Sequence, residues 1–113
     1  METAAGRRKI AEDFAKEAVA KYGECIEEII LYGSVARGES GKESDIDLLV
    51  VSDIPRHKML WDLHGLTTPV LLNKGELISI AVMPRSEMKS LGEGGSFFIK
   101  NVREDGIVLY KEN

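Results

Sequence analysis

Two short apolar runs constrain the fold of this chain more than any other feature. Residues 29–32 read Ile-Ile-Leu-Tyr without a break, and residues 45–51 read DIDLLVV, an apolar run opened by alternating acids. Runs of this length, rich in β-branched residues and flanked by glycine and serine, are typical of strands in the interior of a sheet. The chain is therefore predicted to build a sheet, and helices must cover it.

The remaining segments predict those helices. Apolar residues recur every fourth position over residues 4–22, which indicates an amphipathic helix. Pro55 opens a second long helix that ends near residue 73, and residues 76–83 read as a third strand. Residues 84–95 predict a short helix with a glycine loop, and residues 96–110 predict a last helix and strand. The expected fold class is α/β or α+β, a single sheet with helices packed against it.

Length and charge limit the domain count and the classes of partner. The 113 residues suffice for one compact core, so we expect a single domain over residues 1–113. No apolar run approaches the roughly 20 residues that span a bilayer, which predicts a cytoplasmic protein without a membrane partner. The 15 basic and 19 acidic residues give a net charge of −4, which argues against a free-standing nucleic-acid binder. A homo-oligomer remains open.

The chain has one cysteine, Cys25, at the head of the first apolar run. A single cysteine excludes an internal disulfide. Its position predicts a small, unreactive residue near the core.

Asp45 and Asp47 are the first candidate site residues. Alternation along a strand sends both side chains to one face, where two carboxylates repel unless a cation lies between them. A divalent ion such as Mg²⁺ binds a few carboxylates together with phosphate oxygens and water. The alternative is that the two acids only end a strand at the protein surface.

Gly33, Ser34 and Arg37 are the second group of candidates. A Gly-Ser turn that opens a helical turn offers backbone N–H groups and a hydroxyl, and these groups suit a phosphate. Arg37 could donate two hydrogen bonds to the same phosphate. The alternative for Arg37 is a solvated loop residue. Only the segment from 35 to 44 separates the turn from Asp45, so both groups are expected at one end of the sheet.

The segment GSVARGESGKESDIDLLVV resembles the signature of the minimal nucleotidyltransferases, the small branch of the DNA polymerase beta-like nucleotidyltransferase superfamily. That signature is a Gly-Ser pair, a gap of about this length, and Asp-x-Asp on a strand. The resemblance implies a mixed sheet on which Gly33, Ser34 and Arg37 hold the phosphates of a nucleotide, while Asp45 and Asp47 are catalytic and bind Mg²⁺.

The resemblance also implies a reaction and a partner. It implies the transfer of a nucleoside monophosphate, AMP from ATP, to a hydroxyl on a partner macromolecule. Small members of this family are often antitoxins of helical HEPN-domain proteins. Active members carry a third carboxylate on the following strand, where this chain offers Glu76 at the start and Ser79 nearer the middle. Glu76 is therefore the candidate for a third metal ligand.

A second function remains open from the sequence. If Glu76 does not complete the site, the chain could be a catalytically degenerate binding module that keeps the fold and masks a partner protein. A carboxylate or a metal beside Asp45 and Asp47 would favour the enzyme. A small residue at that place, with a large apolar patch nearby, would favour the binding module.

Overall fold

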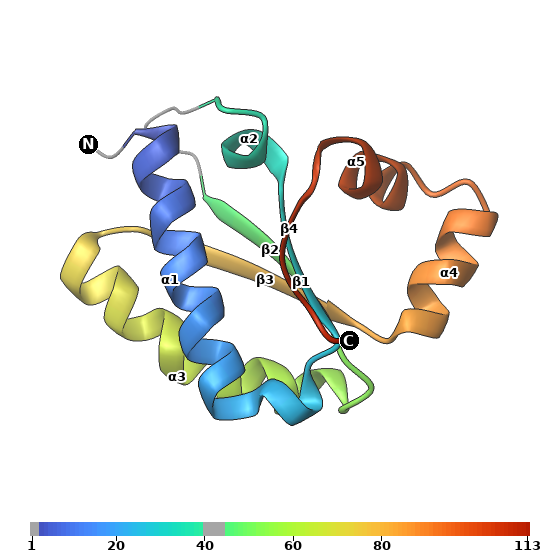
Figure 1. Ribbon diagram of the computed structural model, residues 1–113, viewed down its shortest axis with the longest axis horizontal. Helices are drawn as coiled ribbons and strands as arrows, with labels where there is room; N and C mark the ends of the chain where they lie inside the picture. Colours follow the sequence, from blue (N-terminus) through green and yellow to red (C-terminus); the bar gives the residue numbers. More distant parts are fainter. Residues whose placement is uncertain (1–2, 40–44) are drawn as a thin grey trace.

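A four-stranded sheet with helices on both faces forms the protein (Figure 1). The computed structural model describes residues 3–39 and 45–113. The elements along these residues are α1 (Ala4–Tyr22), η1 (Gly23–Cys25), β1 (Glu28–Tyr32), α2 (Gly33–Ala36), β2 (Ile46–Val51), α3 (Arg56–Lys74), β3 (Ile78–Met83), α4 (Arg85–Glu93), α5 (Phe97–Asp105) and β4 (Ile107–Lys111). The predicted order of elements is confirmed.

Local chemistry explains where the helices begin and end. Thr3 caps α1, because its hydroxyl oxygen accepts a hydrogen bond of 3.0 Å from the backbone N–H of Gly6. Ser96 caps α5 in the same way through the N–H of Ile99. Gly75 ends α3 in the left-handed conformation at φ 67°, a conformation that glycine adopts without a steric penalty.

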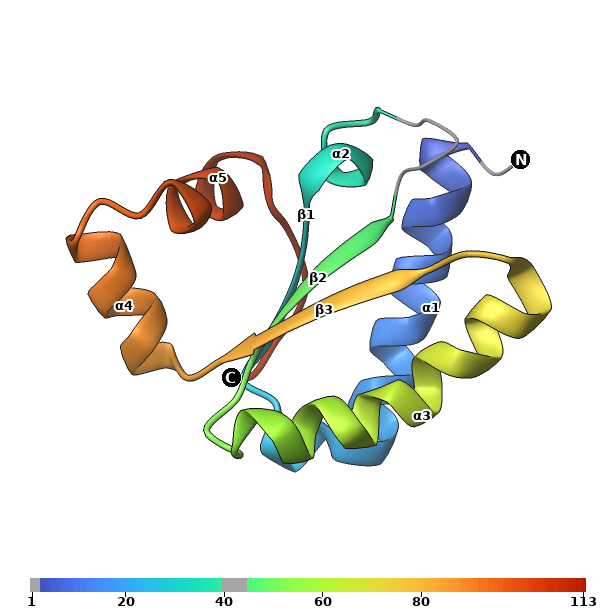
Figure 2. The same ribbon diagram turned by 180° about the vertical axis from the view of Figure 1, so that it is seen from behind.

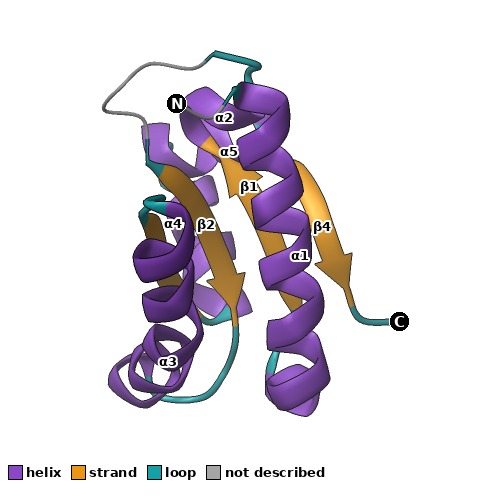
Figure 3. Ribbon diagram, turned by 90° about the vertical axis from the view of Figure 1, so that its left-hand side faces the viewer, coloured by secondary structure: helices purple, strands orange, loops and turns teal. Residues whose placement is uncertain are grey.

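The sheet is mixed and has the strand order β3-β2-β1-β4. Strand β1 is antiparallel to both β2 and β4, and the opposed arrows are visible in Figure 3. Strands β2 and β3 are parallel, and α3 makes the crossover that a parallel pair requires. This arrangement confirms the predicted fold class and puts β2 in the interior of the sheet.

Strand β2 is buried on both faces because two helical layers pack against it. On one face, Leu48 and Val50 belong to a core cluster with residues of α1 and α3. On the other face, Leu49 and Val51 pack with residues of α4 and α5. The two helix pairs lie on opposite sides of the sheet in Figure 1. This double burial explains why the sequence of β2 is continuously apolar after Asp47.

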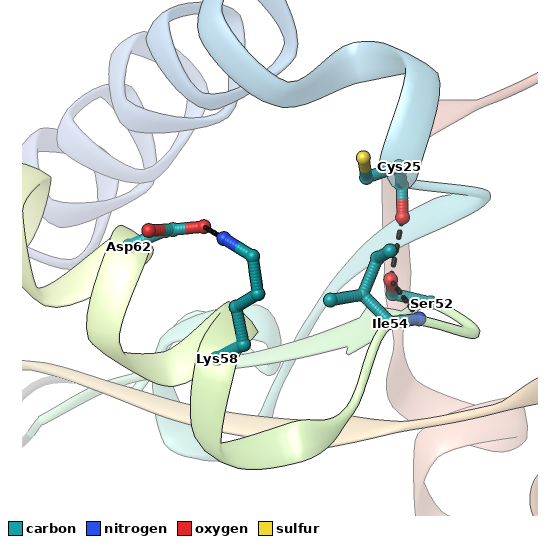
Figure 4. Close-up of polar contacts among 5 residues, drawn as sticks. All are labelled: Cys25, Ser52, Ile54, Lys58 and Asp62. Atoms are coloured by element: carbon teal, nitrogen blue, oxygen red, sulfur yellow. Dashed lines mark hydrogen bonds and ion pairs between the residues drawn. The ribbon is translucent and has the colours of Figure 1, made fainter.

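Ser52 fixes the far end of β2. Its buried hydroxyl donates a hydrogen bond to the carbonyl oxygen of Cys25 and accepts one from the N–H of Ile54 (Figure 4). The same view shows the surface ion pair between Lys58 and Asp62, which are four residues apart on α3. The end of β2 is thus tied to the segment that leads into β1.

The prediction that Cys25 lies near the core was wrong, because its side chain is exposed. The strand begins only at Glu28, so Cys25 belongs to the η1 turn before it. Within the described residues, no helix is both long enough and apolar enough to cross a membrane.

Candidate active site

The Gly-Ser turn and the aspartates meet at one end of the sheet, as the sequence predicted. Strand β1 ends at Tyr32 and runs directly into α2, while the neighbouring strand β2 begins at the same end (Figure 2). The antiparallel register pairs Tyr32 with Asp47. Gly33 and Ser34 are the first two residues of α2, and Asp45 lies one residue before β2.

Gly33 brings the backbone against the carboxylate of Asp47. Its φ of 78° lies in the left-handed region that favours glycine. A Cβ atom at this position would overlap Oδ2 of Asp47 and lie 3.3 Å from its Cγ. The glycine is therefore required twice, by the backbone conformation and by the space that the carboxylate occupies.

Asp47 lies in a partly desolvated, negatively charged environment. Partial burial raises the pKa of the Asp47 carboxyl above its ordinary 3.8, and the nearby charge of Asp45 raises it further. Arg37 acts in the opposite direction and lowers the pKa. Two carboxylates and one guanidinium thus interact at this end of the sheet, and the charge of Asp45 disfavours that of Asp47.

Arg37 follows α2 and joins it to the last helix. Its guanidinium forms ion pairs with Glu39 at 3.3 Å and with Asp105 of α5 at 3.9 Å. Glu39 and Asp105 are both at least partly exposed to solvent, so these ion pairs are weak. The Arg37 side chain can therefore bind a stronger anion such as a phosphate instead. Asp105 was not a sequence candidate, because nothing local links it to Arg37.

An aromatic pair forms the wall beside Asp47. The rings of Tyr32 and Phe98 meet edge to face, with centroids 5.2 Å apart and an interplanar angle of 87°. Burial raises the pKa of the Tyr32 hydroxyl, and the charge of Asp47 raises it further. Sequence reasoning missed Tyr32, although the antiparallel pairing of β1 with β2 would have put it opposite Asp47.

Ser79 lies next to Asp47 on the neighbouring strand β3. The parallel register pairs Asp47 of β2 with Ser79 of β3, so their side chains point to the same face. Ser79 is exposed. The sequence had placed Ser79 nearer the middle of the strand, whereas it is the second residue of β3 because the strand begins only at Ile78.

Glu76, the candidate third ligand, is engaged elsewhere. Its carboxylate Oε2 accepts a 2.9 Å hydrogen bond from Nε of Arg7 on α1, and both residues are buried. Among the residues that the structure describes, no group of three His, Cys, Asp or Glu side chains is arranged to hold a metal ion. Glu76 therefore does not form such a group with Asp45 and Asp47.

Comparison with known proteins decides the family. The model of the nucleotidyltransferase domain family matches residues 11–109, which include all the elements of the site. The chain belongs to the nucleotidyltransferase domain family. The nucleotidyltransferase is also 37% identical over 102 residues to a Methanocaldococcus jannaschii protein named "Putative protein adenylyltransferase MJ0604", covering 90% of this chain and 96% of the relative.

Solved structures agree on the fold of the nucleotidyltransferase. A crystal structure described as a putative nucleotidyltransferase from Sulfolobus solfataricus superposes with a TM-score of 0.64 at 18% identity, over 99% of this chain and 90% of that one. A crystal structure of a toxin–antitoxin with AMP-PNP gives a TM-score of 0.62 at 17% identity, over 90% and 74% of the two chains. At these identities the likeness concerns the fold.

Proposed function

We propose that this nucleotidyltransferase transfers AMP from ATP to a hydroxyl group on a partner protein and releases pyrophosphate, with Mg²⁺ as the metal and residues 1–113 as one catalytic domain. The observation that carries the proposal is the contact of the Asp47 carboxylate with the backbone of Gly33. That contact brings a carboxylate pair and a Gly-Ser turn together at one end of the sheet. A nucleotide that binds both groups would have its phosphates beside its metal.

The donor set suits Mg²⁺. Asp45 and Asp47 supply hard carboxylate oxygens. Burial, and after it the charge of Asp45, raises the pKa of the Asp47 carboxyl, so a cation bound there would stabilise its charged form. Mg²⁺ usually keeps several waters and binds one or two carboxylates together with substrate phosphates, so two aspartates are sufficient. When bound, the metal would neutralise charge on the phosphates during displacement at phosphorus.

The other side chains have roles that follow from their positions. Gly33 and Ser34 would bind phosphate oxygens through the start of α2, and Arg37 would exchange its weak ion pairs for a phosphate. Neither Ser79 beside Asp47 nor the buried Glu76 supplies a free carboxylate to accept the proton of the attacking hydroxyl. The proton of the attacking hydroxyl would therefore pass to Asp45, to Asp47 or to a group of the acceptor protein.

Two of the compared proteins support the choice of nucleotide and acceptor. The M. jannaschii relative is named as a protein adenylyltransferase, and one structural neighbour is a toxin–antitoxin solved with AMP-PNP. A HEPN-domain protein is the partner that the sequence resemblance implies. We propose a HEPN-domain protein as the acceptor and the chain as its antitoxin.

Calorimetry of ATP binding with and without Mg²⁺ tests the proposal. The proteins are the wild type, Asp45→Asn/Asp47→Asn, and the matched control Asp13→Asn/Asp62→Asn, which removes two carboxylates from surface ion pairs. We expect Mg²⁺-dependent binding in the wild type and the control, and none in the site variant. Labelled AMP should then move to a purified HEPN-domain protein with the wild type and the control, and not with the site variant.

Negligible ATP binding by all three proteins would contradict AMP transfer. The chain would then act as a module that masks its partner, a function that the serine beside Asp47 would favour.

A further inference from the structure

A cavity between α4 and α5 lies apart from the residues of the candidate active site. Its volume is about 650 Å³. The buried side chain of Ile99 and the backbone of Gly92 supply apolar lining, and one acid, Glu93, also lines it. Gly95 and Ser96 also line it, together with three exposed cations: Lys89, Lys100 and Arg103. We call this the α4–α5 cavity.

The three cations of the α4–α5 cavity lack internal counterions. Over residues 3–39 and 45–113, none of the three forms an ion pair, whereas Arg37, Arg56 and Arg85 all do. The whole chain is acidic, with a net charge of −4. A cluster of unpaired cations around one cavity in an acidic protein provides a local field that attracts an anionic ligand.

Helix α5 lies between this cavity and the candidate active site. Phe98 of α5 contacts Tyr32, and Asp105 pairs with Arg37. Ile99 and Arg103 of the same helix line the cavity instead. Both Figure 1 and Figure 2 show α5 between α2 and α4. A macromolecule bound at the cavity would therefore reach the carboxylates across a single helix.

We propose that the α4–α5 cavity docks an acidic segment of the acceptor protein through Lys89, Lys100 and Arg103. The inference rests on the proposed function, because it assigns this surface to the protein that receives AMP. Docking there would hold the acceptor hydroxyl near the metal-binding end of the sheet and reduce the entropy cost of transfer.

The lining favours a peptide over a nucleic acid. A phosphate backbone is bound by cations spread along an extended surface, while this cavity gathers its three cations at one place. Leu91 on α4 and Phe97 at the start of α5 are exposed and belong to the same two helices. Exposed apolar side chains surrounded by charged residues that complement the partner's charge are typical of protein–protein contacts.

Fluorescence anisotropy with three defined probes tests the docking site. The probes are a short fluorescein-labelled peptide of glutamates with interspersed leucines, the same peptide with lysine in place of glutamate, and labelled oligouridylate. The site variant is Lys89→Glu/Lys100→Glu/Arg103→Glu. The matched control, Lys16→Glu/Lys21→Glu/Lys74→Glu, makes the same charge change at exposed lysines on α1 and α3.

We expect the acidic peptide to bind the wild type and the control equally, and the site variant about tenfold more weakly or worse. The lysine peptide should not bind. Lys100→Glu alone serves as a milder variant should the triple change unfold the chain, and circular dichroism reports folding. Lys100→Glu should also weaken the binding of the acidic peptide, by less than the triple change.

Equal binding of the acidic peptide to the site variant and the control would overturn the proposal. Tighter binding of oligouridylate that is lost in the site variant would also overturn it, because the surface would then bind nucleic acid. ATP calorimetry on the wild type separates the two proposals. Negligible ATP binding by the wild type would contradict AMP transfer and leave the peptide result intact.

Discussion

A substitution at Gly33 should have two separate effects, one on stability through the backbone conformation and one on ATP binding through the position of Asp47. Gly33→Ala should lower the free energy of unfolding by about 1–2 kcal/mol, because alanine is strained at positive φ. The added methyl would also displace Asp47, so we expect Mg²⁺-dependent ATP binding to fall about tenfold or more. Chemical denaturation and calorimetry measure the two effects.

Gly38 provides the control for that prediction. It has the same φ of 78°, but a Cβ atom there meets nothing within 4 Å. Gly38→Ala should therefore show a similar loss of stability with ATP binding unchanged. Equal loss of binding in both variants would mean that Gly33 acts only through the backbone.

The pKa of Asp47 predicts how stability depends on pH in the absence of metal. Because folding raises this pKa above 3.8, the folded chain binds the proton more tightly than the unfolded chain. The free energy of unfolding should therefore fall as pH rises through the window above 3.8. Asp47→Asn should lessen that fall and give a higher Tm at neutral pH.

Thermal scans in EDTA from about pH 4 to pH 7 measure this effect for the wild type and Asp47→Asn. Adding Mg²⁺ at neutral pH should then raise the Tm of the wild type and leave the variant unchanged. A variant that is less stable than the wild type at neutral pH without metal would contradict the prediction.

At the scale of elements, the buried ion pair between Arg7 and Glu76 joins α1 to the start of β3. Glu76→Gln removes the charge that pairs with the buried guanidinium of Arg7, so we expect a loss of about 3 kcal/mol in the free energy of unfolding. Urea denaturation measures it. Asp13→Asn, which breaks the exposed pair with Lys9, should cost about 0.5 kcal/mol or less.

The same variant tests Glu76 as a metal ligand. If Glu76 only stabilises the fold, the Glu76→Gln variant should keep the Mg²⁺ dependence of ATP binding at a temperature where the variant is folded. A weaker affinity for Mg²⁺, without a matching loss of structure, would restore Glu76 as the third ligand.

The elements themselves could be predicted from the sequence because their signals are local. Helical periodicity, glycine stops and continuous apolar runs gave the α-helices and strands of the described residues, though not the η1 turn. Alternation before β2 correctly put Asp45 and Asp47 near each other. Cys25 was misplaced because an apolar run does not show where hydrogen bonding to the sheet begins. Element ends are decided by partners that lie elsewhere in the chain.

At the scale of the whole molecule, β2 should couple the two helical layers into one unfolding transition. Leu48 and Leu49 are fully buried and face opposite layers. Leu48→Ala and Leu49→Ala should each lower the free energy of unfolding by about 2–5 kcal/mol. Far-UV circular dichroism should show a single transition in both variants.

Leu72→Ala is the control, since Leu72 on α3 is 77% exposed and its loss should change stability by no more than about 0.5 kcal/mol. Separate transitions, with only one layer affected by each core variant, would mean that the layers are independent.

Contacts between distant segments could not be predicted at this scale. Arg37 with Asp105, Tyr32 with Phe98 and Arg7 with Glu76 join elements far apart in the sequence. Each depends on how the sheet orders its strands, and the order β3-β2-β1-β4 leaves no local signal in the sequence. The sequence could predict that the Gly-Ser turn and the two aspartates lie at one end of the sheet, because their pattern is short and continuous, whereas the residues around them are brought together by the strand order.

The parallel pairing of β2 with β3 makes this chain a natural starting point for building a metal-responsive protein. Ser79 is exposed and already lies in register with Asp47, so Ser79→Asp would introduce a third carboxylate without moving the backbone. Three uncompensated negative charges would weaken the metal-free fold, and a divalent ion would restore it. The melting temperature of such a variant would then report the concentration of free Mg²⁺ in solution.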